Sequence, residues 1–94
     1  MKFPTGQVVW TRYINDCIAE NAPFAEFVME SLKRHCSGDW GQLDVEDKRA
    51  NDIALEKGGR LFSAYTQPGK GDSKIWIITE ADRSVTTILF PKEY

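Results

Sequence analysis

The stretch that most constrains the fold is KIWIITEADRSVTTILFPKEY, residues 74–94 of the 94-residue chain. It holds two runs rich in β-branched and aromatic residues, 75–79 and 85–90, on either side of a charged tip at 80–84. Such side chains are stiff at χ1 and fit a pleated surface better than a helix. The stretch therefore predicts a β-hairpin.

The apolar pattern also predicts the register of this hairpin. If the chain reverses within residues 81–84, Glu80 faces Val85 and the two arms pair from there outward. Side chains alternate along a strand, so one face is mostly apolar, whereas the other is mixed. A slip of one residue would exchange the faces, which makes the register specific. The face that we expect to meet helices carries Ile75, Ile77, Ile88 and Phe90, and the mixed face carries Trp76, Ile78 and Leu89.

Helical spacing dominates the first half of the chain. Apolar residues recur every three or four positions within residues 13–18 and 24–35, and a more polar helix is predicted after Asp44. Thr11 and Asp44 are suited to cap the starts of the first and third helices. Glycines near residues 38 and 58 are suited to end the second and third.

The order of elements predicts the fold class. A strand is predicted at residues 60–66, followed by a loop at 67–73 and the hairpin, while residues 7–10 form an edge strand or an extended lead-in. We therefore predict one α+β domain, residues 1–94, with about three N-terminal helices packed on one face of a C-terminal three- to four-stranded antiparallel β-meander. A chain of this size buries roughly 60–65% of its unfolded surface, enough for a modest core.

Charge and cysteine usage narrow the partners and the compartment. The net charge of −2 argues against a large phosphate-binding surface, so we do not expect nucleic acid as a partner. No run approaches the ~20 apolar residues of a membrane span, and the N-terminus lacks the apolar core of a signal peptide. Cys17 and Cys36 lie on the apolar faces of predicted helices. We expect a cytoplasmic protein with reduced, buried thiols and no membrane contact.

Sequence motifs assign no catalytic residue, metal or cofactor. His35 is the only histidine and lies on the apolar stripe of the second helix, so a packed histidine is favoured over a general base or ligand. No Cys/His spacing fits a zinc site. Phosphate-loop, GxSxG and kinase motifs are absent from the sequence.

Charged residues of the predicted sheet are the remaining catalytic candidates. Arg60, Glu80 and Arg83 offer a general base and cations that could clamp a phosphate, as in small ribonucleases with helices before an antiparallel sheet. This likeness is at the level of the fold alone. The other interpretation, which we favour, is a solvated hairpin tip held in place by its own charges, with Asp82 among them.

Tryptophans suggest an interaction surface. The chain has three, and Trp76 together with Leu89 would form an apolar patch on the mixed face of the hairpin. The alternative is that all three complete a small core. The candidate interaction residues are Trp40, Trp76, Glu80, Asp82, Arg83 and Leu89.

Three segments carry a resemblance to a known family: GDWGQLDVED at residues 38–47, residues 51–65, and the hairpin with its last residues, 74–94. Over residues 6–94 the chain resembles small bacterial proteins borne on plasmids, prophages and integrative elements. These are described as plasmid-related proteins, and some as type I restriction endonuclease subunit M. The resemblance supplies no catalytic residue. A methyltransferase needs a doubly wound domain and an Asn/Asp-Pro-Pro-aromatic motif, and this sequence has no Asn-Pro or Asp-Pro pair.

Two function classes follow. The favoured one is a small non-enzymatic interaction or accessory factor of a mobile element, linked to host defence or its inhibition, with an unidentified protein partner. An exposed strand would also allow a homodimer. The alternative is a small RNA-cleaving or RNA-binding toxin-like domain that uses Arg60, Glu80 and Arg83. Convergence of these three in one concave site would favour the enzyme, and scatter around a convex tip would favour the interaction factor.

Overall fold

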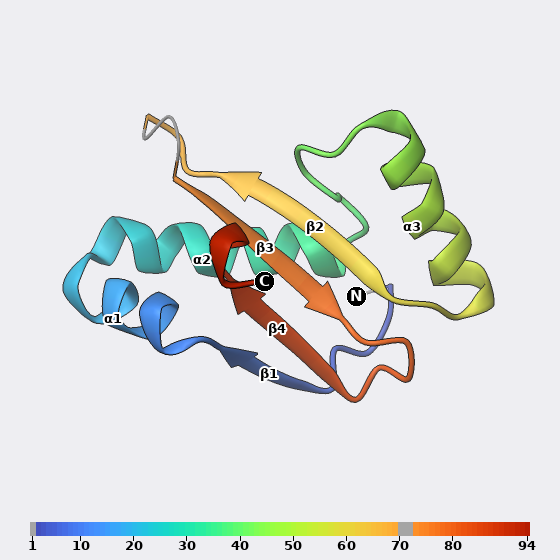
Figure 1. The fold of residues 1–94 in the computed structure, drawn as a ribbon, viewed down its shortest axis with the longest axis horizontal. Coiled ribbons are helices and arrows are strands. Elements are labelled where there is room, and N and C mark those ends of the chain that lie inside the picture. The colour runs from blue at the N-terminus through green and yellow to red at the C-terminus, as the bar shows by residue number, and fades with distance from the viewer. Residues whose placement is uncertain (1, 70–72) are drawn as a thin grey trace.

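The computed structural model describes residues 2–69 and 73–94, so the middle of the predicted loop at 67–73 lies outside the described residues. Helices and strands lie within two residues of the predicted bounds where the sequence predicted them. In chain order, the elements in Figure 1 are β1 (Gln7–Trp10), α1 (Arg12–Glu20), α2 (Ala22–Cys36), α3 (Val45–Lys57), β2 (Leu61–Thr66), β3 (Lys74–Thr79), β4 (Val85–Leu89) and the 3₁₀ helix η1 (Pro91–Glu93).

The four strands form one mixed sheet in the order β1-β4-β3-β2. The predicted antiparallel meander is wrong, because β1 runs parallel to β4 while the other two pairs are antiparallel. The Gln7 N–H donates to the Ser84 carbonyl at 3.0 Å, and the Thr11 N–H donates to the Ile88 carbonyl at 3.2 Å. A strand of four residues carries no signal for its direction; its partner lies at the far end of the sequence and is selected by packing of the whole chain.

The predicted hairpin register is confirmed. Trp76 pairs with Leu89 and Ile77 pairs with Ile88. At the tip, the Glu80 N–H donates to the Val85 carbonyl at 3.0 Å, which closes the turn where the sequence placed it. One face of the hairpin is therefore mostly apolar, with Ile75, Ile77 and Ile88 on it and the Thr79–Thr86 pair next to the turn.

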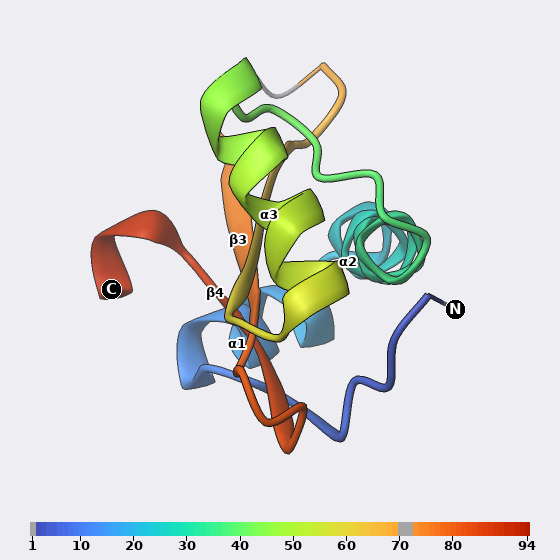
Figure 2. The same cartoon turned by 90° about the vertical axis from the view of Figure 1, so that its right-hand side faces the viewer.

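The apolar face of the sheet packs against helices, as predicted. Helix α2 crosses behind the sheet in Figure 1, and Figure 2 shows α2 on one side of the sheet and the C-terminal segment on the other. Burying an isoleucine side chain fully contributes roughly 1.5–3 kcal/mol, so this layer is a main source of stability. The core on this side consists of Ile14, Phe24, Val28, Tyr65, Ile75, Ile77 and Ile88, with Phe90 packed against it.

Helix α3 lies beside β2 and is joined to the rest of the molecule by a second, smaller core. Phe3, Trp40 and Leu61 are buried there, with Leu43, Ala54 and Leu55 packed around them. The side chain of Asp44 accepts a hydrogen bond from the Asp47 N–H at 2.8 Å, which confirms the predicted N-cap of α3. The hydroxyl of Thr11 does the same for the start of α1. Of the helices described, none has the length and apolar character needed to cross a membrane.

Candidate functional site

The outer face of the sheet, which points away from α2, carries three aromatic side chains in contact, Phe62, Trp76 and Tyr94; we call them the aromatic cluster. The ring centroids of Phe62 and Trp76 are 4.9 Å apart, and those of Trp76 and Tyr94 are 5.7 Å apart, both in edge-on geometry. Within the described residues, the segment seen on this face in Figure 1 is the C-terminal one that contains η1. The aromatic cluster thus lies on the side of the sheet that has no layer of long helices.

A shallow hollow lies against the aromatic cluster. It has a volume of about 200 Å³ and is bounded by Ile78 and Arg60 in addition to the three aromatic residues. Leu89, the cross-strand partner of Trp76, lies on the same face and is buried. Tyr94 is 68% exposed at the rim. The hollow therefore has an apolar floor and an exposed aromatic edge.

Arg60 supplies the charge beside the aromatic cluster. Its Nη1 donates to the Tyr94 hydroxyl at 2.5 Å, and its guanidinium carbon lies 5.4 Å from the centre of the Tyr94 ring. Its Nε lies 3.4 Å from Oε1 of Glu80. The Tyr94 hydrogen bond, followed by the charge of Glu80, raises the pKa of Arg60, which stays a cation. Arg60 and Glu80 therefore form an exposed pair that frames the aromatic cluster.

The Arg83 side chain bonds backbone carbonyls at the end of α3 and does not join Arg60 beside the aromatic cluster. Its Nη1 donates to the Gly59 carbonyl at 2.5 Å and its Nη2 donates to the Ala54 carbonyl at 3.2 Å. The guanidinium also lies 5.8 Å from the ring centre of Phe3, in the second core. Arg83 thus ties the hairpin tip to the last turn of α3. The three residues of the ribonuclease hypothesis, Arg60, Glu80 and Arg83, do not meet in one concave site.

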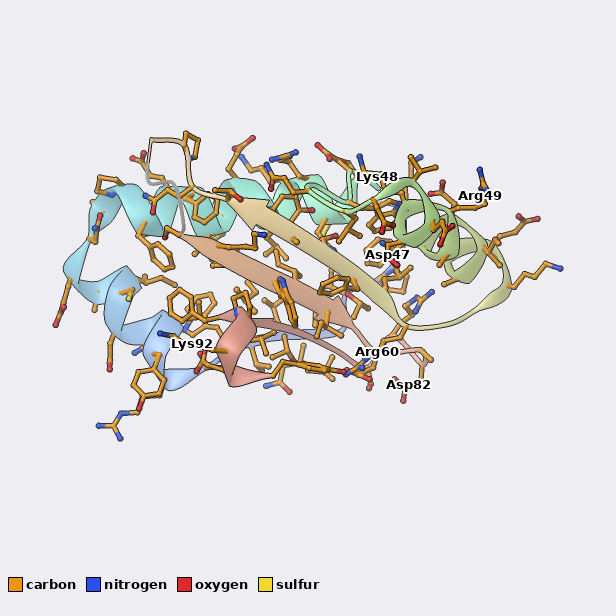
Figure 3. The ribbon with its side chains drawn as sticks, turned by 45° about the horizontal axis from the view of Figure 1, so that its top comes forward. Asp47, Lys48, Arg49, Arg60, Asp82 and Lys92 are labelled. Carbon is orange, nitrogen blue, oxygen red and sulfur yellow. The ribbon has the colours of Figure 1, made fainter. Side chains whose placement is uncertain are left out.

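Asp82 closes the hairpin turn. It lies at the tip of the hairpin in Figure 3, and its Oδ1 accepts hydrogen bonds from the Ser84 hydroxyl at 2.6 Å and the Ser84 N–H at 3.0 Å. The hydroxyl hydrogen bond, ahead of the backbone one, lowers the pKa of Asp82. Its carboxylate is therefore engaged in the turn.

Trp40 is a core residue and not part of the outer face. Its side chain is 4% exposed, its Nε1 donates to Oδ1 of Asp52 at 2.9 Å, and its ring stacks on Phe3 at 6.3 Å between centroids. Of the predicted interaction residues, the structure brings Trp76, Leu89 and Glu80 to the outer face. It places Trp40, Arg83 and Asp82 in packing or turn contacts.

A buried chain of polar side chains, which the sequence did not reveal, links α2 to the sheet through His35. The His35 Nδ1 lies 2.6 Å from the Ser63 hydroxyl and the Nε2 lies 2.9 Å from the Thr79 hydroxyl. The Thr79 hydroxyl lies 2.7 Å from the Thr86 hydroxyl, which donates to the Thr5 carbonyl at 2.8 Å. A usable signal existed, because three hydroxyl residues fall on the apolar face of the predicted strands opposite the only histidine.

The Thr5 carbonyl, at the end of this series of hydrogen bonds, determines which ring nitrogen of His35 carries the proton. A carbonyl oxygen can only accept, so Thr86 donates to it and accepts from Thr79, and Thr79 in turn accepts from His35 Nε2. His35 is therefore the neutral Nε2–H tautomer, with Nδ1 accepting from Ser63. Burial, helped by the positive charge of Arg83, lowers the pKa of His35 to about 4. The histidine is sealed in the core and serves as a structural bridge.

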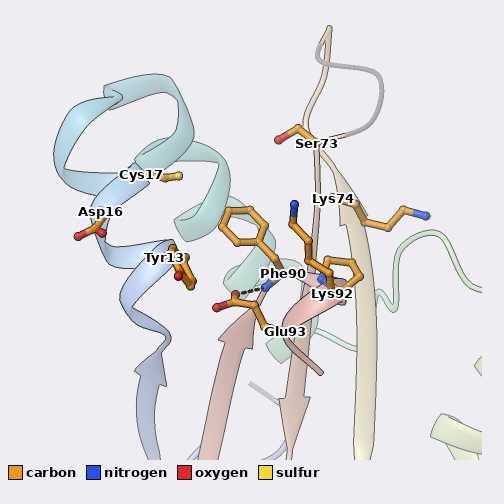
Figure 4. Close-up of a pocket in the computed structure, with 9 residues that line it drawn as sticks. Tyr13, Asp16, Cys17, Ser73, Lys74, Phe90, Lys92 and Glu93 are labelled. Carbon is orange, nitrogen blue, oxygen red and sulfur yellow. Dashed lines mark hydrogen bonds between the residues drawn. The ribbon is translucent and has the colours of Figure 1, made fainter.

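A larger groove of about 1020 Å³ lies at the other end of the sheet, between α1 and η1. In Figure 4, Lys74 points away from α1, and Glu93 is held by the Phe90 N–H at 2.8 Å. The Thr11 hydroxyl also donates to Glu93 at 2.9 Å. No hydrogen bond joins Cys17 to a base within the described part of the chain. The groove is lined by Tyr13, Asp16, Cys17, Ser73, Lys74, Phe90, Pro91, Lys92 and Glu93.

Comparison of the chain with protein-family models, curated proteins and solved structures gave no match. The resemblance to mobile-element proteins therefore stays a prediction. Across residues 2–69 and 73–94, no three His, Cys, Asp or Glu side chains are grouped closely enough to hold a metal ion. The outer face of the sheet, with its aromatic cluster, is therefore the candidate binding surface.

Proposed function

We propose that this protein is a small non-enzymatic binding module, and that a partner protein docks on the outer face of the sheet around Trp76. The observation that carries the proposal is the aromatic cluster framed by Arg60 on a face without a layer of long helices. Tryptophan, tyrosine and arginine dominate the energetics of protein interfaces, because they bury much surface with few rotatable bonds. The shallow hollow beside Trp76 would receive an apolar side chain of the partner.

The charges beside the aromatic cluster favour the same role. Arg60 and Glu80 are both about half exposed and form a weak pair, which could exchange partners at little cost in free energy. Such rim charges contribute to specificity and association rate. We infer that Arg60 and Glu80 orient the partner, whereas Trp76 supplies most of the binding energy.

The alternative function, RNA cleavage or binding by a toxin-like domain, has less support. The Arg83 guanidinium donates hydrogen bonds to the carbonyls of Gly59 and Ala54, so it is not free to bind a phosphate. Glu80 is paired with Arg60 directly after β3, and the only histidine is buried and neutral. A general base needs a free carboxylate or imidazole within reach of the substrate.

The biological setting is part of the proposal and rests on the sequence resemblance. The partner is then a protein of the bacterial host or of the mobile element, in host defence or its inhibition, met in the cytoplasm.

A capture experiment with matched variants tests this function. Tagged wild-type protein, Trp76→Ala and Met29→Ala are compared; Met29 is 51% exposed on α2, on the other side of the sheet. We expect the same specific protein with wild type and Met29→Ala, and a loss of at least about fivefold with Trp76→Ala, because an interface hot spot exceeds 1 kcal/mol. Thermal melts of all three verify folding. Equal capture by all three, together with RNA turnover that Glu80→Gln abolishes, would establish the alternative function instead.

A further inference from the structure

The two edge strands of the sheet differ in whether their outward backbone groups are bonded. Those of β2 are bonded by residues outside the sheet, so this edge is closed. The Asn51 side chain bonds both outward backbone groups of Phe62, donating to its carbonyl at 2.6 Å and accepting from its N–H at 3.0 Å. Gln42 donates its N–H to the Ala64 carbonyl at 2.7 Å and accepts from the Thr66 N–H at 2.9 Å through Oε1. A strand from another molecule cannot add to this edge without breaking these bonds.

The opposite edge, β1, is open. In a parallel pair the N–H and C=O of one residue point to the same neighbouring strand. Gln7 and Thr11 donate to β4, so the alternate residues Val8 and Trp10 direct their N–H and C=O groups away from the sheet. No hydrogen bond from a side chain or loop reaches these four groups in the part of the chain that the structure describes.

Features that commonly discourage pairing at an open edge are absent from β1. Proteins blunt such edges with lysine, proline, bulges or a covering segment. Residues 7–10 are Gln-Val-Val-Trp, which contain no charge and no proline, and their pairing with β4 runs without a bulge. Trp10 is 38% exposed at this edge. The edge is therefore suited to accept another uncharged strand.

We propose that the β1 edge binds β1 of a second copy of this chain, antiparallel, about a two-fold axis that passes through Val9. In this register Val8 of each copy lies opposite Trp10 of the other, and all the outward N–H and C=O groups of these residues bond across the axis. Trp10 then covers Val8 of the second copy on the side of the helices. The result is a continuous sheet of eight strands, built from two sheets of four.

The composition of β1 favours a second copy over a different protein. A two-fold axis places every residue against its own strand, so a charged strand would repel itself, whereas this one carries no charge. The pairing surface is short compared with a standard interface, so the dimer is weak and concentration-dependent. This inference does not depend on the proposed function, because the β1 edge and the aromatic cluster lie at different places on the sheet.

Sedimentation of the full chain from about 5 µM to about 1 mM tests the dimer, because its population follows mass action. Val8→Pro removes one outward N–H and leaves the bonds of Gln7 and Thr11 to β4 in place; proline is tolerated at such edge positions. We expect the dimer dissociation constant to rise at least tenfold in Val8→Pro. The matched control, Thr87→Val, alters only a side chain on β4, one strand in from the β1 edge, and should leave the constant within about twofold.

Disulfide trapping tests the register, and keeps the proposal testable if Val8→Pro does not fold. In a Cys17→Ala/Cys36→Ala background, Val9→Cys places one thiol from each copy on the axis. The non-hydrogen-bonded antiparallel pair there brings Cα atoms to about 4.5 Å, within the range of a disulfide. It should cross-link at least tenfold faster than Thr87→Cys, which lies on β4 beside Val9. A monomer at every concentration, a dimer indifferent to Val8→Pro in folded protein, or equal cross-linking rates would overturn the proposal.

Discussion

At the scale of single residues, His35 shows how one polar side chain in an apolar layer can be stabilising. Both ring nitrogens are bonded, to the Ser63 and Thr79 hydroxyls, so no donor or acceptor of the ring is left unsatisfied in the core. The burial of His35 makes the stability of the fold depend on pH. Burial lowers the pKa of His35 to about 4, whereas in the unfolded chain this pKa is about 6.5.

The first prediction concerns this pH dependence. Between these two pKa values the unfolded chain binds a proton that the folded chain lacks, so the free energy of unfolding falls as pH drops from about 7 to about 4, by about 3 kcal/mol from His35 alone. His35→Gln keeps an acceptor and a donor but does not titrate. Urea unfolding at stepped pH should therefore show a smaller fall in the variant. Parallel curves for wild type and variant would contradict the buried neutral histidine.

Arg83 combines a strained backbone with a strong set of hydrogen bonds. Its φ of 61° is in the left-handed region, which costs a non-glycine residue roughly 1 kcal/mol. Its guanidinium bonds the carbonyl of Gly59, just after α3, and that of Ala54, which also accepts from the Gly58 N–H at the helix end. The side chain offsets the strain of its own backbone.

A second prediction separates these two effects. Arg83→Ala should lose about 1–3 kcal/mol of unfolding free energy, because it removes the hydrogen bonds and keeps the strain. Arg83→Gly loses the same bonds but relieves the strain, so it should be more stable than Arg83→Ala by about 1 kcal/mol. Thermal or urea unfolding of the three proteins provides the comparison. Arg83→Gly less stable than Arg83→Ala would contradict the inferred strain.

At the scale of elements, α3 is joined to the sheet by one polar residue as well as by the packing of Ala54 and Leu55 in the second core. Asn51 is buried and bonds both outward groups of Phe62, so the helix closes the edge of β2. Much of the rest of the helix is exposed, as the polar sequence predicted. An asparagine in a helix is a weak signal for edge protection, which is why the sequence did not reveal this role.

The third prediction follows from that contact. Asn51→Ala should lower the free energy of unfolding by about 2 kcal/mol, because two partly buried backbone groups of Phe62 lose their partners. It should also increase aggregation, because the β2 edge becomes available for pairing. Glu56→Ala, an exposed change on the same helix, is the control for helix propensity. Denaturant unfolding and light scattering measure the two effects; a variant that resembles the control in both would exclude an edge-protecting role for Asn51.

The strands show where sequence patterns suffice and where they fail. The β3–β4 register was predictable, because alternation over ten residues and a charged turn specify which residues pair. The parallel pairing of β1 was not, because residues 7–10 pair with residues 85–88 at the other end of the sequence, and no local pattern specifies so distant a partner. Local patterns determine local pairs, and distant pairs depend on the packing of everything between them.

At the scale of the whole molecule, the two faces of the sheet are covered differently. Helix α2 covers the apolar face, and the C-terminal segment lies on the other side of the sheet (Figure 2). The outer face keeps the aromatic cluster at its surface. Trp76 and Leu89 were predictable on the outer face, because they alternate with the core residues along the hairpin. The positions of Phe62 and Tyr94 beside Trp76 were not predictable, since these contacts join three separate segments of the chain. The burial of Trp40 against Phe3 was not predictable either.

The central claim is that the outer face binds a partner protein, and site-specific photo-cross-linking tests it most directly. A photoreactive residue at Thr87, on the outer face in β4, is compared with one at Met29 on α2. We predict that Thr87 yields a specific protein adduct in the native host, that Met29 does not, and that Trp76→Ala reduces the Thr87 adduct at least about fivefold. Adducts of equal yield from both positions, or a Thr87 adduct insensitive to Trp76→Ala, would contradict the account.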